Sequence, residues 1–374
     1  MPLIDLIAGA RPNFMKIASI VDALHRRAED QGRPAGQAPL TYRLIHTGQH
    51  YDQTMSGSFF EQLGLPQPHL NLEVGSGTAA EQTGGIMVRY EQVLAERRSD
   101  LCVVVGDVTS TMACAIVAKK AGVPVAHVEA GIRSGDWSMP EEVNRVVTDA
   151  VTDYFFTTSD AACAHLRKAG VADERIFFVG NTMIDSLLRQ LPNLRRPAIW
   201  DDLGLTPRGY FVLTLHRPAN VDAPDTLGAL LNAVVAGTRG LPVIFPVHPR
   251  TMKSLAPLGP LKPALTITPP LGYLEFNYLV RDARAVITDS GGITEEATIL
   301  DVPCFTLRDN TERPETVTVG TNRLIGTNPA NLAPAFDDLF AGKWPAGRAP
   351  EKWDGKAGVR IVAALEQVLY RREL

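Results

Sequence analysis

The chain has 374 residues, of which 45% are hydrophobic and 21% charged, and its net charge is −4 at neutral pH. This length suffices for two domains, each with its own core, and the composition is that of an ordinary globular protein. The small negative charge, without any Lys/Arg block, argues against nucleic-acid and membrane partners, so we expect small-molecule ligands.

The amino terminus and the cysteines indicate the compartment. The first residues enter a strand pattern at once, with no basic leader and no apolar run long enough to span a bilayer, which predicts a cytoplasmic protein. The four cysteines stand singly, without a CxxC pair or a histidine at ligand spacing. We therefore expect reduced core thiols rather than metal ligands at Cys102, Cys114, Cys163 and Cys304.

Residues 1–190 alternate short β-branched runs with helical stretches, the pattern of βαβ units around a mostly parallel sheet. The predicted strands are Leu3 to Ala8, Tyr42 to Thr47, Leu101 to Gly106, Pro124 to Glu129, Tyr154 to Thr158 and Ile176 to Gly180. The pattern then breaks over residues 191–209, a stretch with Pro, Arg and one Trp that we interpret as an interdomain linker.

The alternation resumes over residues 210–355. The predicted strands there are Tyr210 to Leu215, Pro242 to Val247, Leu265 to Thr268, Ala285 to Thr288, Pro303 to Leu307 and Arg323 to Gly326. A last helix over 356–374 has an apolar face and is a candidate to cross back to the first domain. The sequence thus predicts an α/β protein of two Rossmann-like, doubly wound domains, whose strands' carboxyl ends imply a ligand cleft.

Two glycine turns near the amino terminus differ in what they indicate. Gly9 begins a turn from strand to helix that carries Arg11 and Lys16, two cations able to contact a diphosphate. Solvated surface charge is the structural alternative, and it suits Arg11 less because that residue lies inside the turn. Residues 75–80 match a dinucleotide fingerprint, but they follow a poor central strand, so we interpret them as a loop before a helix rather than as an NAD site.

Carboxylates follow two predicted strands. Asp107 comes after the strand that ends at Gly106, and Glu129 ends the next one. A helix cap is the structural alternative for Asp107, because Asp is a frequent N-cap, whereas Glu is a poor cap. Glu141 follows Pro140 at a helix start and is weak evidence by itself. Together, the three acids indicate one acidic edge of the sheet.

The second half supplies cations at corresponding places. His216 and His248 each end a predicted strand, and each is followed closely by an arginine. A lone histidine at a strand end is more often structural, but two of them beside arginines favour an anion-binding face. Metal binding fits poorly, because neither has another ligand at the required spacing.

The segment from Thr288 to Glu296 runs from an apolar strand through a Ser-Gly-Gly turn into a helix. Ser290, Gly291 and Gly292 can bring backbone amides close to a phosphate at the positive end of the helix. We expect Glu295 and Glu296 in the first helical turn, where one of them could bind a ribose diol. A well-capped helix after a buried strand is the structural alternative.

Taken in order, these motifs resemble those of the non-hydrolysing UDP-N-acetylglucosamine 2-epimerases. The matching runs span residues 9 to about 326. They are Gly9–Lys16, His46–His50, Gly106–Thr111, His127–Arg133, Met139–Glu142, Val179–Thr182, Leu215–Arg217, Pro246–Pro249, Leu271–Phe276, Thr288–Ile293 and Arg308–Glu315.

The resemblance implies two Rossmann-like domains of the glycosyltransferase-B type, a homodimer, a UDP-sugar in the interdomain cleft, and a reaction without metal or other cofactor. It assigns catalysis to Asp107, Glu129, Glu141 and His216. It assigns UDP binding to the remaining candidates, which are Arg11, Lys16, His248, Phe276, Ser290, Gly291, Gly292, Glu296 and Arg313. In such a reaction the C2 proton is removed while UDP leaves C1, and UDP then adds back to a 2-acetamidoglucal.

The chain departs from the family pattern at Asn13, at Pro218 and Ala219, and at Thr294. These differences leave the substrate open between UDP-GlcNAc and a 2,3-diacetamido uronic acid relative. A glycosyltransferase, a hydrolysing epimerase that releases UDP, and an inert nucleotide-sugar sensor are also possible readings of the same motifs. The sequence also leaves open which carboxylate acts as acid or base, and whether UDP-GlcNAc is an allosteric activator.

Overall fold

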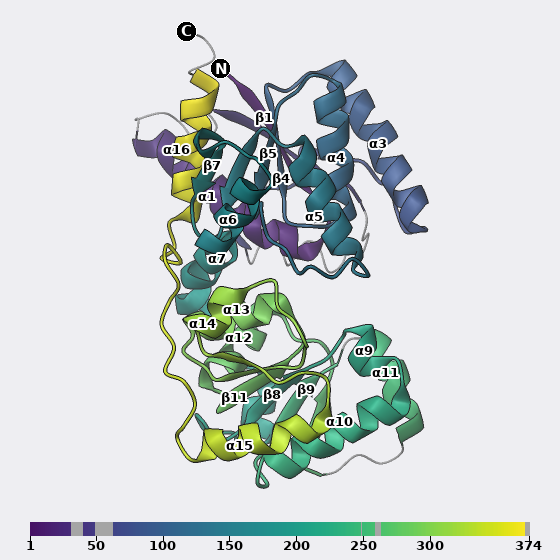
Figure 1. Cartoon of the computed structure of the whole chain (residues 1–374), viewed down its shortest axis with the longest axis vertical. Coiled ribbons are helices and arrows are strands. Elements are labelled where there is room, and N and C mark those ends of the chain that lie inside the picture. The colour runs from purple at the N-terminus through teal and green to yellow at the C-terminus, as the bar shows by residue number, and fades with distance from the viewer. Residues whose placement is uncertain (31–39, 49–62, 248, 259–262, 371–374) are drawn as a thin grey trace. The chain divides into compact units, whose positions relative to one another are not determined.

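The computed structural model describes residues 1–30, 40–48, 63–247, 249–258 and 263–370. The chain forms two compact units (Figure 1). Unit 1 comprises Met1–Arg189 with Glu351–Leu374, and unit 2 comprises Gln190–Pro350. Each unit contains one parallel sheet with helices packed against it, which confirms the predicted α/β fold class with two Rossmann-like domains.

Unit 1 has a sheet in the order β3-β2-β1-β4-β5-β6-β7. The strands are β1 (Leu3–Ala8), β2 (Thr41–His46), β3 (Leu70–Asn71), β4 (Leu101–Val105), β5 (Val125–Val128), β6 (Tyr154–Thr157) and β7 (Ile176–Phe178). The helices are α1 (Arg11–Asp30), α3 (Ala79–Glu96), α4 (Thr109–Lys120), α5 (Pro140–Val151), α6 (Asp160–Lys168), α7 (Thr182–Gln190) and α16 (Ala357–Tyr370). Among the described strands of unit 1, β3 alone was not predicted, because two residues show no hydrophobic period.

The core of unit 1 follows from strands that are apolar on both faces. Every residue of β4 is buried, as its unbroken apolar sequence predicts for a strand covered on both sides. On one face Cys102 and Val104 pack with Ile86 and Tyr90 of α3 and with residues of α4. All four cysteines of the chain are buried and free, as predicted.

The C-terminal helix α16 belongs to unit 1 and packs on α1. The backbones of α16 and α1 approach closely, because a Cβ at Gly358 would lie 2.3 Å from the carbonyl oxygen of Ser19. Asp185 of α7 accepts hydrogen bonds from the amides of Ala357 and Gly358 and so caps the first turn of α16. The last predicted helix therefore does pack its apolar face, and it does so on the first unit.

Unit 2 has a sheet in the order β10-β9-β8-β11-β12-β13. The strands are β8 (Phe211–Thr214), β9 (Val243–Pro246), β10 (Leu265–Thr268), β11 (Ala285–Thr288), β12 (Cys304–Thr306) and β13 (Asn322–Leu324). The helices are α8 (Ala198–Asp202), α9 (Pro218–Val221), α10 (Pro224–Gly237), α11 (Pro249–Leu255), α12 (Tyr273–Asp282), α13 (Gly291–Ile299), α14 (Pro314–Thr318) and α15 (Leu332–Phe340).

The two faces of this second sheet carry separate cores, because side chains alternate along each strand. Phe211 and Leu213 of β8 pack with α10 and α15, whereas Val212 packs on the opposite face with α12 and α13. In Figure 1, α10 and α15 lie on one side of β8, β9 and β11, with α12 and α13 on the other. Trp200, from the stretch interpreted as a linker, contacts Tyr210 and Tyr278 edge-on and is thus part of this core.

Both sheets share one strand order, in which the first strand of the unit lies between the second and the fourth. The chain therefore turns in opposite directions on either side of β1 and β4 in unit 1, and of β8 and β11 in unit 2. In doubly wound sheets, ligands bind beyond the carboxyl ends of strands at this switch point. The fold thus favours the segments after β1 and β4, and those after β8 and β11, as ligand-binding positions.

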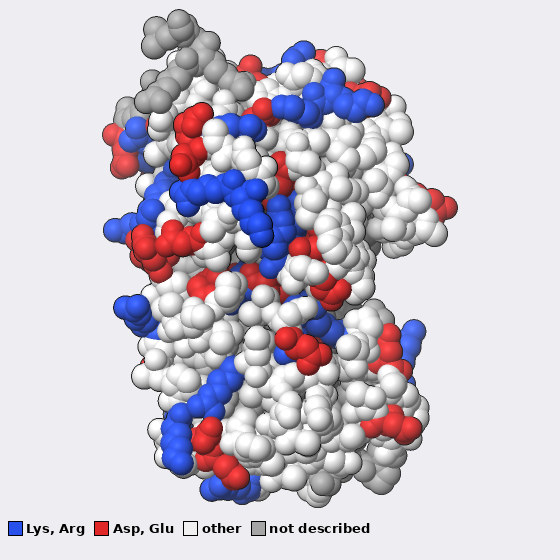
Figure 2. Space-filling model, viewed as in Figure 1, with Lys and Arg blue, Asp and Glu red and all other residues white. Residues whose placement is uncertain are grey.

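Charged side chains are mixed on the face of the molecule that Figure 2 shows. On the face drawn in Figure 2, Lys and Arg are interspersed with Asp, Glu and uncharged residues. No helix within the described part of the chain has the length and apolar character that crossing a membrane requires.

Candidate active site

The carboxylates of unit 1 lie where two neighbouring strands end. Val105 of β4 pairs with Val128 of β5, so Asp107 and Glu129 follow adjacent strands at almost the same level. Glu129 has φ of +70°, in the left-handed region that a Glu side chain rarely adopts. Its amide donates to the carbonyl of Phe156 in the next strand, which helps hold this conformation. The fold therefore forces Glu129 into an unusual backbone geometry at a strand end, as is frequent at functional sites.

Glu129 is paired with a buried lysine. Lys16 Nζ lies 2.7 Å from Glu129 Oε2, and the side chains are 10% and 3% exposed. Burying a carboxylate is costly unless a cation lies beside it, and Lys16 supplies that cation for Glu129. Lys16 reaches it past Gly106, where a Cβ would lie only 2.9 Å from Nζ. Thus Lys16, which we expected to contact the diphosphate, contacts a carboxylate in this structure.

Asp107 is held by an arginine that was not among the predicted site residues. Arg145 of α5 donates from Nη2 and Nε to Asp107 Oδ2 at 2.5 and 3.0 Å. The same guanidinium donates from Nη1 to Glu142 at 2.9 Å. Helix α4 is capped by the backbone of Val108 without a side-chain bond, so the alternative role of Asp107 as N-cap is wrong. The side chain of Asp107 is 27% exposed, so its carboxyl is accessible to a ligand.

Glu142 anchors this arginine. It is buried and accepts hydrogen bonds from the amides of Ser134 and Gly135. Burial by itself would raise the pKa of Glu142, but these amides and Arg145 outweigh it and lower the pKa. Its neighbour Glu141, the predicted catalytic residue, is exposed in the first turn of α5, directly after Pro140.

In unit 2, His216 contacts a buried aspartate, Asp289. His216 Nδ1 lies 2.8 Å from Asp289 Oδ1, and the histidine side chain is 51% exposed while the aspartate is fully buried. Asp289 also accepts from the amides of His216 and Arg217 and from Asn220 Nδ2. Burial alone would raise the pKa of Asp289, yet these donors lower it. An ionised Asp289 therefore orients the imidazole and leaves Nε2 directed away from the carboxylate.

The Ser-Gly-Gly turn lies next to this pair, at the start of α13. Ser290 is the N-cap residue, without a side-chain capping bond, and its amide donates to Thr288 Oγ1. Gly291 is the first helical residue, and a Cβ there would lie 3.0 Å from Glu312 Oε1. The positive end of α13 and the side chain of His216 therefore follow the adjacent strands β11 and β8.

Glu295 and Glu296 lie in the second turn of α13, so the prediction that they occupy the first turn was wrong. The helix begins at Gly291, not at a later residue, because its capping residue is Ser290. Glu296 is buried and accepts a hydrogen bond from the hydroxyl of Tyr273 at 2.9 Å. Burial raises the pKa of Glu296 to about 7, against the effect of that hydrogen bond. Glu295 is buried as an ion pair with Arg313.

The remaining predicted binding residues are less informative. Phe276 of α12 is partly buried against the core of unit 2. His248 and the side chain of Arg11 lie outside the described residues. Residues 75–77 form a loop, and Thr78 caps α3 through a capping box with Glu81, so the interpretation of this segment as a loop before a helix is confirmed.

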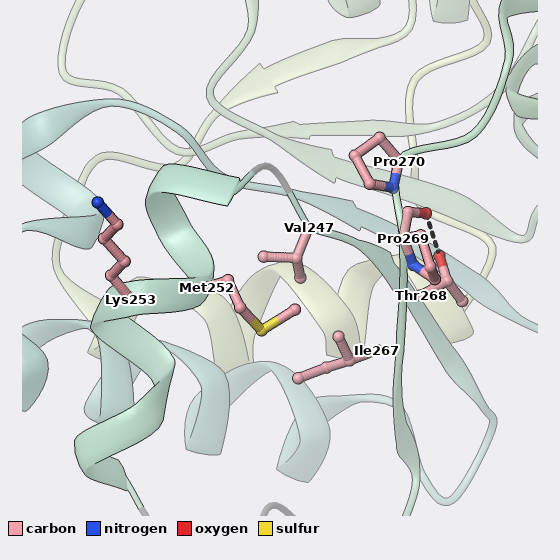
Figure 3. Close-up of a pocket in the computed structure, with 7 residues that line it drawn as sticks. All are labelled: Val247, Met252, Lys253, Ile267, Thr268, Pro269 and Pro270. Atoms are coloured by element: carbon pink, nitrogen blue, oxygen red, sulfur yellow. Dashed lines mark hydrogen bonds between the residues drawn. The ribbon is translucent and has the colours of Figure 1, made fainter.

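A pocket in unit 2 does not coincide with these groups. It has a volume of about 540 Å³ and lies after β9 and β10, with mainly apolar walls. Val247, Met252 and Ile267 point toward one another there, whereas the ammonium of Lys253 points away (Figure 3). We place the site by its chemistry instead, after β8 and β11. In the parts of the chain that the structure describes, no three acidic, His or Cys side chains are grouped as metal ligands would be.

Sequence reasoning missed Arg145, Glu142 and Asp289. Asp289 was recognisable in principle, since it directly follows β11 at the switch point, as Asp107 follows β4. For Arg145 and Glu142 the sequence indicated only that they lie on one face of a helix, because they are three residues apart. The link from Arg145 to Asp107 spans 38 residues and required the structure.

The chain is similar to known proteins of one family. The family model described as UDP-N-acetylglucosamine 2-epimerase matches residues 35–366. The UDP-N-acetylglucosamine 2-epimerase of Methanocaldococcus jannaschii is 41% identical, over 97% of this chain and 98% of the relative. The UDP-2,3-diacetamido-2,3-dideoxy-D-glucuronate 2-epimerase of Pseudomonas aeruginosa is 39% identical, over 86% of this chain and 87% of the relative.

Solved structures give the same result for the fold. The crystal structure of the M. jannaschii enzyme in complex with UDP-GlcNAc and UDP matches with a TM-score of 0.84 at 40% identity, covering 98% of this chain and all of that one. A Staphylococcus aureus MnaA–UDP structure matches with a TM-score of 0.87 at 29% identity, over 99% and 97% of the two chains. This chain belongs to the UDP-N-acetylglucosamine 2-epimerase family.

Proposed function

We propose that this protein is a non-hydrolysing UDP-GlcNAc 2-epimerase that interconverts UDP-GlcNAc and UDP-ManNAc. One observation carries the proposal: in a chain of this family, the carboxyl edge of one sheet bears cation-paired carboxylates, and that of the other bears a His–Asp pair beside a glycine turn. The first set suits proton transfer at a sugar carbon, and the second suits stabilisation of a diphosphate.

Unit 2 supplies the leaving-group chemistry. The C2 hydrogen of the sugar has no adjacent carbonyl, so its removal requires assisted departure of UDP from C1. Backbone amides at Gly291 and Gly292 and the dipole of α13 bind the diphosphate. His216, oriented by Asp289, stabilises the negative charge that develops on the departing phosphate oxygen. Glu296 accepts the ribose hydroxyls when it is ionised.

Unit 1 supplies the acid and base. A carboxylate takes the C2 proton, the C–H electron pair forms the C1=C2 double bond, and the C1–O bond breaks toward UDP. The products of this step are a 2-acetamidoglucal and UDP. UDP then attacks C1 again, while C2 receives a proton on the opposite face. Asp107 and Glu129 are the groups proposed for these transfers, and Glu141, which is exposed on α5, is the third candidate.

The same proposal covers assembly and compartment. We assign the protein as a cytoplasmic homodimer that needs neither metal nor other cofactor, with a UDP-sugar as its ligand. The free, buried cysteines suit a reducing compartment. Light scattering on a size-exclusion column tests the dimer: a mass near 81 kDa, twice the 40.6 kDa of one chain, supports it, and a mass near 41 kDa contradicts it.

A second substrate is favoured by one specific finding, the similarity to the P. aeruginosa UDP-2,3-diacetamido-2,3-dideoxy-D-glucuronate 2-epimerase. Proton NMR of the purified protein with each UDP-sugar in turn distinguishes the two. Appearance of the C2 epimer from UDP-GlcNAc supports the primary assignment. Turnover of the diacetamido uronic acid alone would replace it.

The same spectra separate epimerisation from hydrolysis, glycosyl transfer and simple binding. A hydrolysing relative releases free ManNAc together with UDP, and a glycosyltransferase leaves UDP-GlcNAc unchanged until an acceptor is added. An inert sensor binds UDP-GlcNAc without any turnover. A mixture of intact UDP-GlcNAc and UDP-ManNAc, with no free sugar, is the result that supports the proposal.

A further inference from the structure

A buried histidine and aspartate link the two turns that carry the carboxylates. His127 lies in β5 and is completely buried, and Asp149 lies in α5. His127 Nδ1 is 2.7 Å from Asp149 Oδ1. On the other side of the ring, His127 Nε2 is 2.8 Å from the carbonyl oxygen of Gly106, the residue just before Asp107.

The aspartate extends this link to the second turn. Asp149 Oδ2 accepts from the amide of Gly131 at 3.1 Å, two residues after Glu129, and from Arg133 Nη2 at 2.6 Å. Burial would raise the pKa of Asp149, but the contacts with His127 and Arg133 outweigh it and lower the pKa. Asp149 thus acts as an ionised acceptor for three donors.

The chemistry of the partners fixes the role of the imidazole. A carbonyl oxygen can only accept, and an ionised carboxylate can only accept, so both ring nitrogens of His127 face acceptors. The imidazole therefore bridges the Asp149 carboxylate and the Gly106 carbonyl, with one contact at each ring nitrogen. A glutamine or asparagine cannot span both partners with two separate donors at this distance.

We propose that His127 and Asp149 are positioning residues that fix the spacing of Asp107 and Glu129. Each bonds the backbone of one of the two turns that carry these carboxylates, and the two bond each other. This inference rests on the proposed function, because it concerns the residues assigned there to proton transfer. A small displacement of a catalytic group costs up to about 100-fold in rate, so loss of this link should lower kcat.

The test compares Asp149→Asn with a control of equal burial. Asp5 in β1 forms a buried ion pair with Arg43 at 2.7 Å and accepts from Tyr90, and within the described residues it bonds neither turn. Asp5→Asn should therefore lose stability in a similar way without affecting the carboxylates. Measurements on the full chain are kcat and KM for UDP-GlcNAc, the midpoint of thermal unfolding, and backbone hydrogen exchange followed by mass spectrometry.

We expect Asp149→Asn to lower kcat by about 10- to 100-fold with KM changed by less than about threefold. Exchange should accelerate in the peptides that contain both turns, 106–108 and 129–133. Asp149→Glu, which keeps the carboxylate, should recover part of the lost rate. Asp5→Asn should lower the unfolding midpoint yet keep kcat within about twofold of wild type.

Two results would overturn the proposal: a loss of kcat that follows the unfolding midpoint equally in both variants, or accelerated exchange in only one of the two turns. The exchange measurement needs no turnover, so it decides the link even if the wild-type protein does not epimerise UDP-GlcNAc. In that case the proposed function is contradicted, and the exchange pattern alone decides whether His127 and Asp149 link the two turns. His127→Gln provides the second variant and should reproduce the exchange pattern of Asp149→Asn.

Discussion

The two units have the same sheet order but carry different groups at the carboxyl ends of their strands. In unit 1 the strand-end groups are the carboxylates Asp107 and Glu129, each supported by a buried cation. In unit 2 the strand-end group is His216, half exposed and supported by a buried carboxylate. The fold therefore determines where these candidate groups lie, and a buried partner of the other chemical type lies behind each of them.

This difference predicts a functional division between the two units. Changes in unit 1 should affect proton transfer and leave nucleotide affinity intact, whereas changes at the glycine turn of unit 2 should affect nucleotide affinity first. Each of the following variants tests that division on one side.

The largest effect is expected for the carboxylates. Asp107→Asn and Glu129→Gln remove an ionisable group proposed to transfer the C2 proton, so kcat should fall on the order of 100-fold or more. The Kd for UDP, measured by calorimetry, should stay within about threefold of wild type. Glu174→Gln changes an exposed acid of the same unit and should leave both constants unchanged. A loss of UDP affinity equal to the loss of kcat would contradict the division.

The next effect is expected at Gly106. Gly106→Ala places a Cβ 2.9 Å from the present position of Lys16 Nζ and should displace the lysine from Glu129. We expect kcat to fall by about 10- to 100-fold. Gly170→Ala is the matched control, because Gly170 also has positive φ but a Cβ there would meet no described atom within 4 Å. It should carry the same backbone strain, about 1 kcal/mol, and keep its activity. Equal loss of activity in both variants would show that strain, not the lysine, is responsible.

On the side of unit 2, Gly291→Ala should weaken UDP binding. A methyl group at the first residue of α13 meets Glu312 at 3.0 Å and obstructs the approach of a phosphate to the backbone amides. Loss of one charge-assisted hydrogen bond, about 2 kcal/mol, corresponds to about 30-fold in Kd by calorimetry. Gly84→Ala in α3 is the control, since its Cβ would have open space. An unchanged Kd for Gly291→Ala would remove this turn from the binding site.

The smallest effect concerns pH. The pKa of Glu296 is raised to about 7, so the carboxyl is neutral below pH 7 and ionised above it. If the ionised form accepts the ribose hydroxyls, affinity must rise as pH rises, by about tenfold from pH 6 to pH 8. UDP-GlcNAc is the suitable ligand, because its diphosphate is esterified at both ends and does not titrate in this range. Glu296→Gln should bind more weakly and lose the part of the pH dependence that Glu296 contributes; an unaltered profile would contradict the role.

The sequence predicted the fold well, because the signals for it are local. Continuous apolar runs such as 101–105 and the glycine or proline stops after helices need no long-range information. Asp107, Glu129 and His216 were chosen as candidates for the same reason, since each lies one or two residues after a strand. The supporting partners could not be found in this way. Lys16 and Glu129 are 113 residues apart, and Asp289 is 73 residues from His216, so only the strand order brings them together.

The proposed function requires exchange of the C2 proton of UDP-GlcNAc and depends on both Glu129 and His216. The most direct measurement is proton NMR of UDP-GlcNAc incubated with the protein in deuterated buffer. Wild type should produce UDP-GlcNAc and UDP-ManNAc that both carry deuterium at C2, and Glu129→Gln and His216→Asn should each slow this incorporation by about 100-fold or more. Epimers that keep protium at C2, or deuterium incorporation that survives in both variants, would contradict the claim.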